Sequence, residues 1–397
     1  MHAIAEAIPA GRVEGEVAPG WEAVADAFVE SFRSRGEAAA SVHLRLRGEV
    51  VVDLWGGSAA DGTVCERDSV QVLFSCTKVA SAVVMHLLAE RGSIDLDAPA
   101  AELWPELAAE GKAALTPRMI LDHSAGLPAF RAPVPADVLV NQDGAAARLA
   151  AQAPFWEPGT RTGYHALTYG VLLGELARRA DGRSLGRIFA EDVAGPLGLD
   201  LHVGLPESEE PRVLPIAVRR PSPEDPETPF TRAATTRGTI SNLFVFNSGD
   251  WATKGLNTRE GRAAEVPAAG GIGNARSLSG LFDALLAGRI LTPETVADLA
   301  RCSSATHLDA TLQTATRFGP GFMLAMEDRR RGGSGEALRL PARAFGHTGA
   351  GGSLGFADPE SGLAFGYAMT RMGFGLFLNP RGEALLDAAR EGLRRAV

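Results

Sequence analysis

Several residue types are scarce in this chain of 397 residues. It contains three cysteines and three tyrosines, and most of its 39 basic residues are arginines rather than lysines. The cysteines Cys65, Cys76 and Cys302 show neither metal-ligand spacing nor a disulfide framework. Reduced thiols of this kind are typical of the cytoplasm. Where a residue type is scarce, each of its positions carries more information about function.

Long apolar runs are also missing. No segment approaches the roughly 18 consecutive apolar residues of a membrane-spanning helix. The first twenty residues have neither the basic start nor the apolar stretch of a secretory signal. If the sequence is complete at its start, we therefore expect a cytoplasmic protein with no membrane partner.

An excess of basic charge is absent as well. The net charge is -9 and the pI about 5.5, which argues against a nucleic-acid partner. The short basic run Arg329–Arg331 stands beside two glycines and is predicted to be a solvated turn. The histidines show no paired ligand spacing, and Gly271-x-Gly273 lacks the third glycine of a dinucleotide fingerprint. We therefore expect no metal and no cofactor.

The composition is otherwise that of a globular protein, with 45% hydrophobic and 22% charged residues. Alternating patterns with β-branched residues predict strands, and apolar residues at helical spacing predict helices. The predicted strands are residues 40–46, 50–55, 321–326, 353–357 and 363–369. The predicted helices are residues 20–35, 75–91, 277–287, 293–301 and 381–395, and the 75–91 helix is apolar nearly all around and should be buried.

Strands thus lie at both ends of the chain and helices fill the middle. The simplest packing is one antiparallel sheet built from both ends, with a mainly helical lobe inserted between them. We expect a single domain, with a sheet subdomain of about 20–75 plus 310–397 and a helical subdomain of about 76–300. The segment 205–238 is rich in proline and charge and is predicted to be a long ordered loop or lid.

A Ser-x-x-Lys pattern, Ser75-Cys76-Thr77-Lys78, opens the predicted buried helix. Residues three apart on a helix share one face, with Cβ atoms about 5–6 Å apart, so the lysine amine can reach the serine hydroxyl. Burial and the positive end of the helix dipole both lower the pKa of an amine, and a neutral amine can activate serine. A pattern this short also arises by chance. An unpaired buried lysine is costly, however, and this favours the functional interpretation.

Two further segments carry candidate chemistry. Tyr164 lies on a predicted loop just before a helix, in Gly163-Tyr164-His165-Ala166, where a phenol can share a proton with serine and lysine or can simply be a core aromatic. The glycine-rich run from Phe345 to Ser353 lets a substrate approach the backbone, and one of its N–H groups can bind an oxyanion. A tight turn would be equally rich in glycine.

In order and rough spacing these three segments resemble the serine β-lactamase and penicillin-binding-protein superfamily, which has Ser-x-x-Lys, Tyr-x-Asn and Lys-Thr-Gly. The likeness is greatest to its esterase branch, the family VIII carboxylesterases and class C β-lactamase-like hydrolases. It runs from about residue 20 to the C-terminus and includes Asp122–Pro128, Pro196–Leu199 and Gly270–Gly273. The resemblance implies the α/β (α+β) β-lactamase/transpeptidase-like fold, with an antiparallel sheet flanked by helices.

The resemblance also implies roles. Ser75 is the expected nucleophile, Lys78 its general base and Tyr164 the proton relay, and the N–H groups of Ser75 and Ala350 are the expected oxyanion hole. His347, Thr348 and Gly349 are expected to bind substrate. Ala166 and His347 depart from the family pattern, since they replace an asparagine and the lysine that holds a substrate carboxylate. A neutral imidazole anchors an anion poorly, so both departures favour uncharged esters over β-lactams.

We therefore expect a serine carboxylesterase that acts on a small-molecule ester through an acyl-enzyme on Ser75. The alternatives left open are an acyltransferase, an amide or peptide hydrolase and a weak β-lactamase that use the same acyl-enzyme. A catalytically silent binding protein is disfavoured, because it would not need a buried amine. The rival Gly-x-Ser-x-Gly pattern at Ser353 is rejected as a nucleophile elbow, since a strand rather than a helix should follow it and no histidine occurs after His347.

Overall fold

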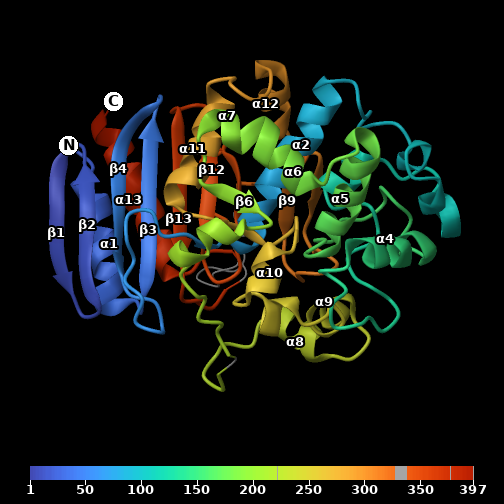
Figure 1. The fold of residues 1–397 in the computed structure, drawn as a ribbon, viewed down its shortest axis with the longest axis horizontal. Coiled ribbons are helices and arrows are strands. Elements are labelled where there is room, and N and C mark those ends of the chain that lie inside the picture. Colours follow the sequence, from blue (N-terminus) through green and yellow to red (C-terminus); the bar gives the residue numbers. More distant parts are fainter. Residues whose placement is uncertain (221, 327–337, 376, 397) are drawn as a thin grey trace.

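Antiparallel strands from both ends of the chain form the larger sheet (Figure 1). The computed structural model describes residues 1–220, 222–326, 338–375 and 377–396. Within these residues the strand order is β1-β2-β4-β3-β13-β12-β11-β10-β9-β8. The strands are β1 (His2–Ile8), β2 (Gly11–Val17), β3 (Ala39–Leu46), β4 (Glu49–Gly57), β8 (Ser304–Thr306), β9 (Thr316–Gly319), β10 (Phe322–Leu324), β11 (Phe345–Thr348), β12 (Leu354–Asp358) and β13 (Leu363–Met369).

A small second sheet connects this sheet with the helical part of the chain. Its order is β5-β7-β6, formed by β5 (Gln71–Val72), β7 (Gly271–Gly273) and β6 (Leu201–Val203). The α-helices are α1 (Glu22–Ser34), α2 (Thr77–Glu90), α3 (Pro117–Leu121), α4 (Gln142–Ala151), α5 (Thr168–Asp181), α6 (Leu185–Phe189), α7 (Gly195–Leu197), α8 (Pro229–Thr235), α9 (Ile240–Phe246), α10 (Arg259–Ala263), α11 (Ala275–Leu286), α12 (Pro293–Leu299) and α13 (Pro380–Ala396).

Helices cover both faces of the larger sheet. Consecutive strand residues point to opposite faces, and in β3 the imidazole of His43 contacts Ser279 of α11 at 2.6 Å. Tyr367 of β13 points to the other face, where its hydroxyl donates to Glu37 beside α13. Helices α1 and α13 pack together on that side, behind the strands in Figure 1. The sheet is therefore the middle layer of a three-layer body.

Helix α2 lies in the centre of the molecule, as its all-round apolar surface predicts. Every side chain from Thr77 to Leu88 is buried. The predicted helix is divided at its start, because a 3₁₀ turn, η1 (Phe74–Cys76), precedes α2. Phe74 has φ of 49°, a left-handed conformation that costs energy for a residue with a Cβ atom. The bend places Ser75 at the junction between the small sheet and the buried helix.

The predicted subdomain boundaries are wrong at two places. The sheet starts at His2 rather than near residue 20, because the hairpin β1–β2 extends it at one edge. Strand β1 is exposed at most of its positions, so it lacks the buried alternation that identifies a strand in sequence. Helix α11 falls within the predicted helical subdomain but packs on β3, β12 and β13. The other predicted strands and helices are present, with ends that differ by a few residues.

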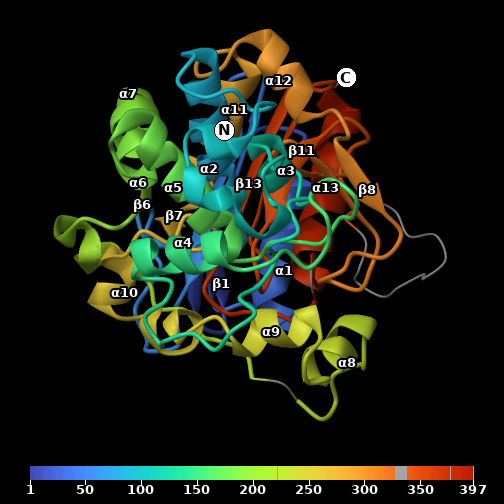
Figure 2. The same ribbon diagram turned by 90° about the vertical axis from the view of Figure 1, so that its right-hand side faces the viewer.

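The segment predicted as a long loop or lid contains short helices. Residues 207–212 form a 3₁₀ helix and 229–235 form α8, and α9 lies beside α8 at the lower end of the molecule (Figure 2). The run Arg329–Arg331 lies outside the described residues. Among the residues described, none of the helices combines the length and the apolar character that crossing a bilayer requires.

Candidate active site

The three predicted catalytic side chains meet at one cavity. Ser75 comes from η1, Lys78 from the first turn of α2, and Tyr164 from the loop before α5. Ser75 and Tyr164 line a cavity of about 390 Å³, and Lys78 lies beneath them with no exposed surface. Residues some ninety positions apart in sequence are thus brought together by the packing of α2 against α5.

The amine of Lys78 is fully buried and has three polar neighbours. Its Nζ donates to the carbonyl of Ala166 at 2.7 Å and to the carbonyl of Ala268 at 3.0 Å, and it lies 3.5 Å from Ser75 Oγ. Burial lowers the pKa of this amine well below its usual 10.5. A neutral amine has two N–H groups and one lone pair. Because the two carbonyls take the N–H groups, the lone pair is left for the hydroxyl of Ser75.

The phenol of Tyr164 is protonated at rest. Burial raises its pKa above the usual 10, although a hydrogen bond with Ser75 opposes this shift. The ring lies 4.8 Å from Lys78 Nζ, measured to its centroid. The serine oxygen therefore lies between a neutral amine that can accept a proton and a phenol that can donate one. This arrangement provides for proton transfer in both directions.

Sequence reasoning missed the residues that hold Tyr164 in place. The buried carboxylate of Asp309 accepts from the N–H of Tyr164 at 3.0 Å and from the N–H groups of Thr311 and Leu312 at 2.8 Å. Asp309 is 145 residues from Tyr164 in the chain. Nothing in the local sequence marks it, because an isolated aspartate usually caps a turn.

Two buried histidines, His123 and His165, also contact the stretch of chain that carries Tyr164. His123 accepts at its carbonyl from Gly163 and at Nδ1 from the N–H of His165, both at 3.1 Å, and its ring lies 4.8 Å from the Tyr164 ring. His165 Nε2 accepts from the N–H of Leu127 at 2.9 Å. Burial lowers the pKa of His165 to about 3 and that of His123 well below its usual value, so both rings are neutral. The Asp122–Pro128 segment thereby supports the tyrosine.

Ala350 is an exposed residue at the rim of the cavity, on an otherwise buried turn between β11 and β12. The turn is closed by hydrogen bonds from Gly349 N–H to Ser353 at 2.7 Å and from Gly352 N–H to Gly349 at 3.0 Å. Within the described part of the chain, no hydrogen bond from the N–H of Ser75 or of Ala350 is recorded. Both N–H groups are therefore available to an oxyanion, and the assignment stays a prediction.

Of the three predicted substrate-binding residues, one lines the cavity and two do not. Thr348 lines the cavity, whereas His347 and Gly349 are buried and do not line it. His347 Nδ1 contacts the carbonyl of Thr348 at 2.7 Å. Burial lowers the pKa of His347 to about 3, so its imidazole is neutral. His347 therefore lies within β11 and away from the cavity surface, and its role in binding substrate stays a prediction.

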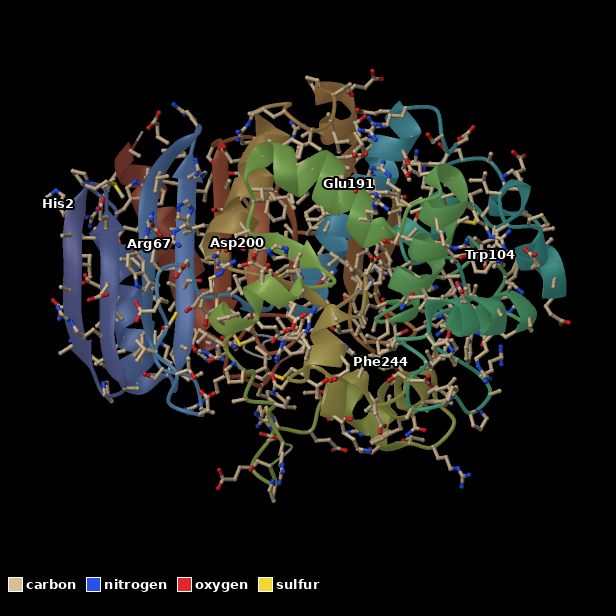
Figure 3. All side chains as sticks on the ribbon, viewed as in Figure 1. His2, Arg67, Trp104, Glu191, Asp200 and Phe244 are labelled. Atoms are coloured by element: carbon tan, nitrogen blue, oxygen red, sulfur yellow. The ribbon has the colours of Figure 1, made fainter. Side chains whose placement is uncertain are left out.

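The cavity has a mainly apolar lining, and one wall comes from residues 218–252, a stretch that begins in the predicted lid (205–238) and runs past its end. Phe244 of α9, labelled in Figure 3, lies on this wall. The part of this wall beyond the predicted lid is fixed by hydrogen bonds from Ser241 Oγ to the Thr311 carbonyl at 2.6 Å and from Asp250 N–H to the Ala136 carbonyl at 2.8 Å. Among the lining residues that the structure describes, only Arg219 carries a full charge, and it is paired with Asp225. The aromatic lining residues besides Tyr164 are Phe74, Phe230, Phe244, Trp251, Phe374 and Phe377.

Other candidate groups lie elsewhere. The hydroxyl of Ser353 is buried without a hydrogen-bond partner in the described structure, and β12 rather than a helix follows it, so the rejection of the elbow is confirmed. Cys76 is buried against His347, to whose carbonyl its thiol donates at 3.3 Å.

Asp200, labelled in Figure 3, lies close to His202 and Glu209 in a group that could in principle hold a metal ion. Arg212 pairs with the carboxylates of both Asp200 and Glu209, so this cluster is an ion-pair network.

Known proteins are similar to this chain in sequence and in fold. A family model described as Beta-lactamase matches residues 21–390. The chain is 34% identical over 381 residues to Esterase/beta-lactamase LipL of Mycobacterium tuberculosis, which covers 91% of this chain and 83% of that protein. The structure of a family VIII carboxylesterase is 36% identical with a TM-score of 0.83, over 96% of this chain and 99% of that one. EstA from Arthrobacter nitroguajacolicus is 32% identical with a TM-score of 0.84, over 100% of both chains.

Proposed function

Because this chain belongs to the Beta-lactamase family, we propose that it is a serine carboxylesterase that forms an acyl-enzyme on Ser75. The fold is the β-lactamase/transpeptidase-like fold, and the relatives at about one-third identity include a carboxylesterase and an esterase/beta-lactamase. One observation carries the proposal. The buried amine of Lys78, whose pKa is lowered by burial, donates to the carbonyls of Ala166 and Ala268 and lies 3.5 Å from Ser75 Oγ.

Acylation begins when Ser75 attacks the ester carbonyl. The hydroxyl proton passes to Lys78, and the C–O bond that forms places a negative charge on the former carbonyl oxygen. The N–H groups of Ser75 and Ala350 stabilise this oxyanion. When the intermediate collapses, Tyr164 gives its proton to the departing alkoxide and regains one from Lys78. The alcohol leaves, and the acyl group stays on Ser75.

Water completes the cycle. It attacks the acyl-enzyme, its proton returns through Tyr164 and Lys78, and the acid leaves as Ser75 recovers its hydrogen. An alcohol or an amine in place of water would give acyl transfer, which remains the nearest alternative. The rate at which each acceptor speeds the loss of a trapped acyl group from Ser75 distinguishes hydrolysis from transfer.

The substrate is an uncharged ester with an apolar part. The cavity is lined mainly by apolar side chains, and its one lining cation, among the described residues, is already paired with Asp225. His347 stands where the family's carboxylate-binding lysine is expected, but it is buried and neutral. A carboxylate on the substrate would therefore be desolvated without a partner, which costs binding free energy.

Serine substitution tests the proposal directly. Ser75→Ala should abolish hydrolysis of a short p-nitrophenyl ester, whereas Ser353→Ala, a matched change at a buried serine, should leave the rate largely intact. A fluorophosphonate should label Ser75 alone in wild-type protein, as peptide mass analysis can show. If both alanine variants fold and lose activity equally, the assignment of the nucleophile is wrong.

A further inference from the structure

The turn that carries Ala350 has few interactions of its own. Gly351 and Gly352, the next two residues, have φ of 86° and 127°, conformations that favour glycine. Glycine leaves the backbone intrinsically free, so contacts from outside the turn add to its two internal hydrogen bonds in fixing the position of the Ala350 N–H. The contacts of the neighbouring carbonyl, that of Gly351, show how this is done.

The Gly351 carbonyl accepts three hydrogen bonds from the C-terminal segment. Gly373 N–H donates at 2.8 Å, Asn379 Nδ2 at 2.7 Å and the Arg381 guanidinium at 3.3 Å. A carbonyl oxygen has two lone pairs, so three donors saturate it. Asn379 is itself fixed, because its Oδ1 accepts from the N–H groups of Arg381 and Gly382 at the start of α13. The turn is thus attached to the end of a helix.

Behind Arg381 lies a charge pair with almost no exposure. The side chains of Arg381 and Glu37 are 4% and 0% exposed, and their N–O distance is 2.7 Å. Glu37 also accepts from the Ala38 N–H at 3.1 Å and from the hydroxyl of Tyr367. The same guanidinium donates to the Arg371 carbonyl at 2.8 Å. The guanidinium is therefore held on several sides.

Stability alone does not explain such a pair. Replacement of a buried ion pair by apolar residues of similar volume is often neutral or stabilising. The pair instead fixes an orientation. Glu37 holds the planar guanidinium of Arg381 so that it donates to the carbonyl of Gly351, the residue after Ala350. Of these residues Gly351 and Gly373 line the cavity, whereas Glu37, Asn379 and Arg381 do not.

We propose that Asn379 and the Glu37–Arg381 pair are positioning residues for the oxyanion hole, which they hold in place through the Gly351 carbonyl. The role rests on the proposed function, since it presumes that the Ala350 N–H binds an oxyanion. Displacement of a catalytic group by about 1 Å can lower a rate by about a hundredfold. Because the oxyanion forms only as the ester is attacked, the effect falls on kcat rather than on KM.

The substitution Asn379→Asp tests this role with a minimal change of shape. The carboxylate keeps an oxygen for the N–H groups at the start of α13, but it replaces the donor to the Gly351 carbonyl by an acceptor. Asn141→Asp is the matched control, because Asn141 caps α4 by accepting from Gly144 N–H at 3.1 Å and lies outside the cavity lining. The second test combines Glu37→Gln with Arg381→Met, which removes both charges together and leaves an oxygen for Tyr367.

Three measurements separate positioning from simple structural damage. They are kcat and KM on a p-nitrophenyl ester, the inhibition constant of a trifluoromethyl ketone that forms a tetrahedral oxyanion on serine, and the thermal midpoint. We expect Asn379→Asp and the double variant to lower kcat by about 10- to 100-fold and to keep KM within about twofold. The ketone should bind more weakly by the same factor as kcat/KM, while Asn141→Asp behaves as wild type.

Unchanged kcat and ketone affinity in both test variants would overturn the positioning role. So would losses that the Asn141→Asp control reproduces, or a fall in kcat without a fall in ketone affinity. These results differ from a failure of the proposed function, in which the wild type itself neither hydrolyses the ester nor is labelled at Ser75. That last outcome would overturn the function and the positioning role together.

Discussion

The proposed role of Lys78 can be tested by comparing its substitution with the same substitution at Lys112, the other buried lysine. Lys78→Met removes the base but keeps the length of the side chain. General base catalysis contributes about 10²–10⁴-fold, so kcat should fall by that factor, which is about 2.7–5.4 kcal/mol of barrier at 1.36 kcal/mol per decade. KM should change little, because the amine lies under the cavity rather than in it.

The structural cost of the same change can be worked out from its contacts. The carbonyls of Ala166 and Ala268 lose their donors, and each unsatisfied buried acceptor costs about 1–3 kcal/mol. Removal of a buried amine offsets part of this cost, since burying a polar group is itself unfavourable. The variant should therefore remain folded, with a lowered thermal midpoint.

Lys112→Met is the matched control. Lys112 is also buried and donates to two backbone carbonyls, those of Ala109 and Gln152, both at 2.6 Å. The two variants should lose similar stability, but only Lys78→Met should lose activity. Steady-state kinetics with p-nitrophenyl butyrate and the rate of fluorophosphonate labelling measure the difference. A folded Lys78→Met variant within about tenfold of the wild-type kcat would refute the role of the amine as base.

Three further predictions concern the same cavity. Tyr164→Phe should lower kcat by about 10²–10⁴-fold with little change in thermal midpoint, because phenylalanine keeps the ring but cannot pass a proton. Phe244→Ala should favour octanoyl over acetyl esters by several-fold in kcat/KM, since it enlarges the cavity at the α9 wall. Because the pKa of Lys78 is lowered in the fold, the unfolded chain binds more protons below pH 10. Denaturant unfolding between pH 7 and 9 should therefore show wild-type stability rising relative to Lys78→Met, by up to about 1.4 kcal/mol per pH unit.

The sequence predicted those parts of the site that depend on local spacing. Ser75 and Lys78 are three residues apart, and the helical repeat alone brings them to one face. The strand β13 and the buried helix α2 were also predictable, because their apolar patterns are continuous. Tyr164 could be assigned only through the family resemblance, since no local rule relates it to a helix ninety residues earlier.

The supporting residues could not be predicted, because each acts across a long stretch of chain. Asp309 holds Tyr164 from 145 residues away, and Arg381 meets Glu37 across 344 residues. A single aspartate or arginine is usually a surface residue, so neither position stands out in the sequence. The hairpin β1–β2 was missed for a different reason. It lies at the sheet edge, where exposure removes the alternation that identifies strands.

Burial shifts the pKa values of five side chains in and around the site in the direction that favours their uncharged forms. It lowers the pKa of Lys78 and of the three nearby histidines, His123, His165 and His347, and it raises that of Tyr164. Burial therefore favours the uncharged form of all five groups before reaction, and attack on the ester is the step that creates new charges among them. Transfer of the serine proton then creates an ammonium on Lys78 and an oxyanion on the substrate at the same moment.

Each of these new charges meets groups already in place. The carbonyls of Ala166 and Ala268 and the face of the Tyr164 ring receive the ammonium, and N–H groups at the other side of Ser75 receive the oxyanion. In a site of low dielectric constant the two charges also attract each other strongly. A substrate that brings its own carboxylate would add a negative charge before reaction, and this charge would repel the oxyanion that forms on attack. The proposed preference for uncharged esters and the proposed role of Lys78 as base thus have the same physical origin, which is the burial of the site.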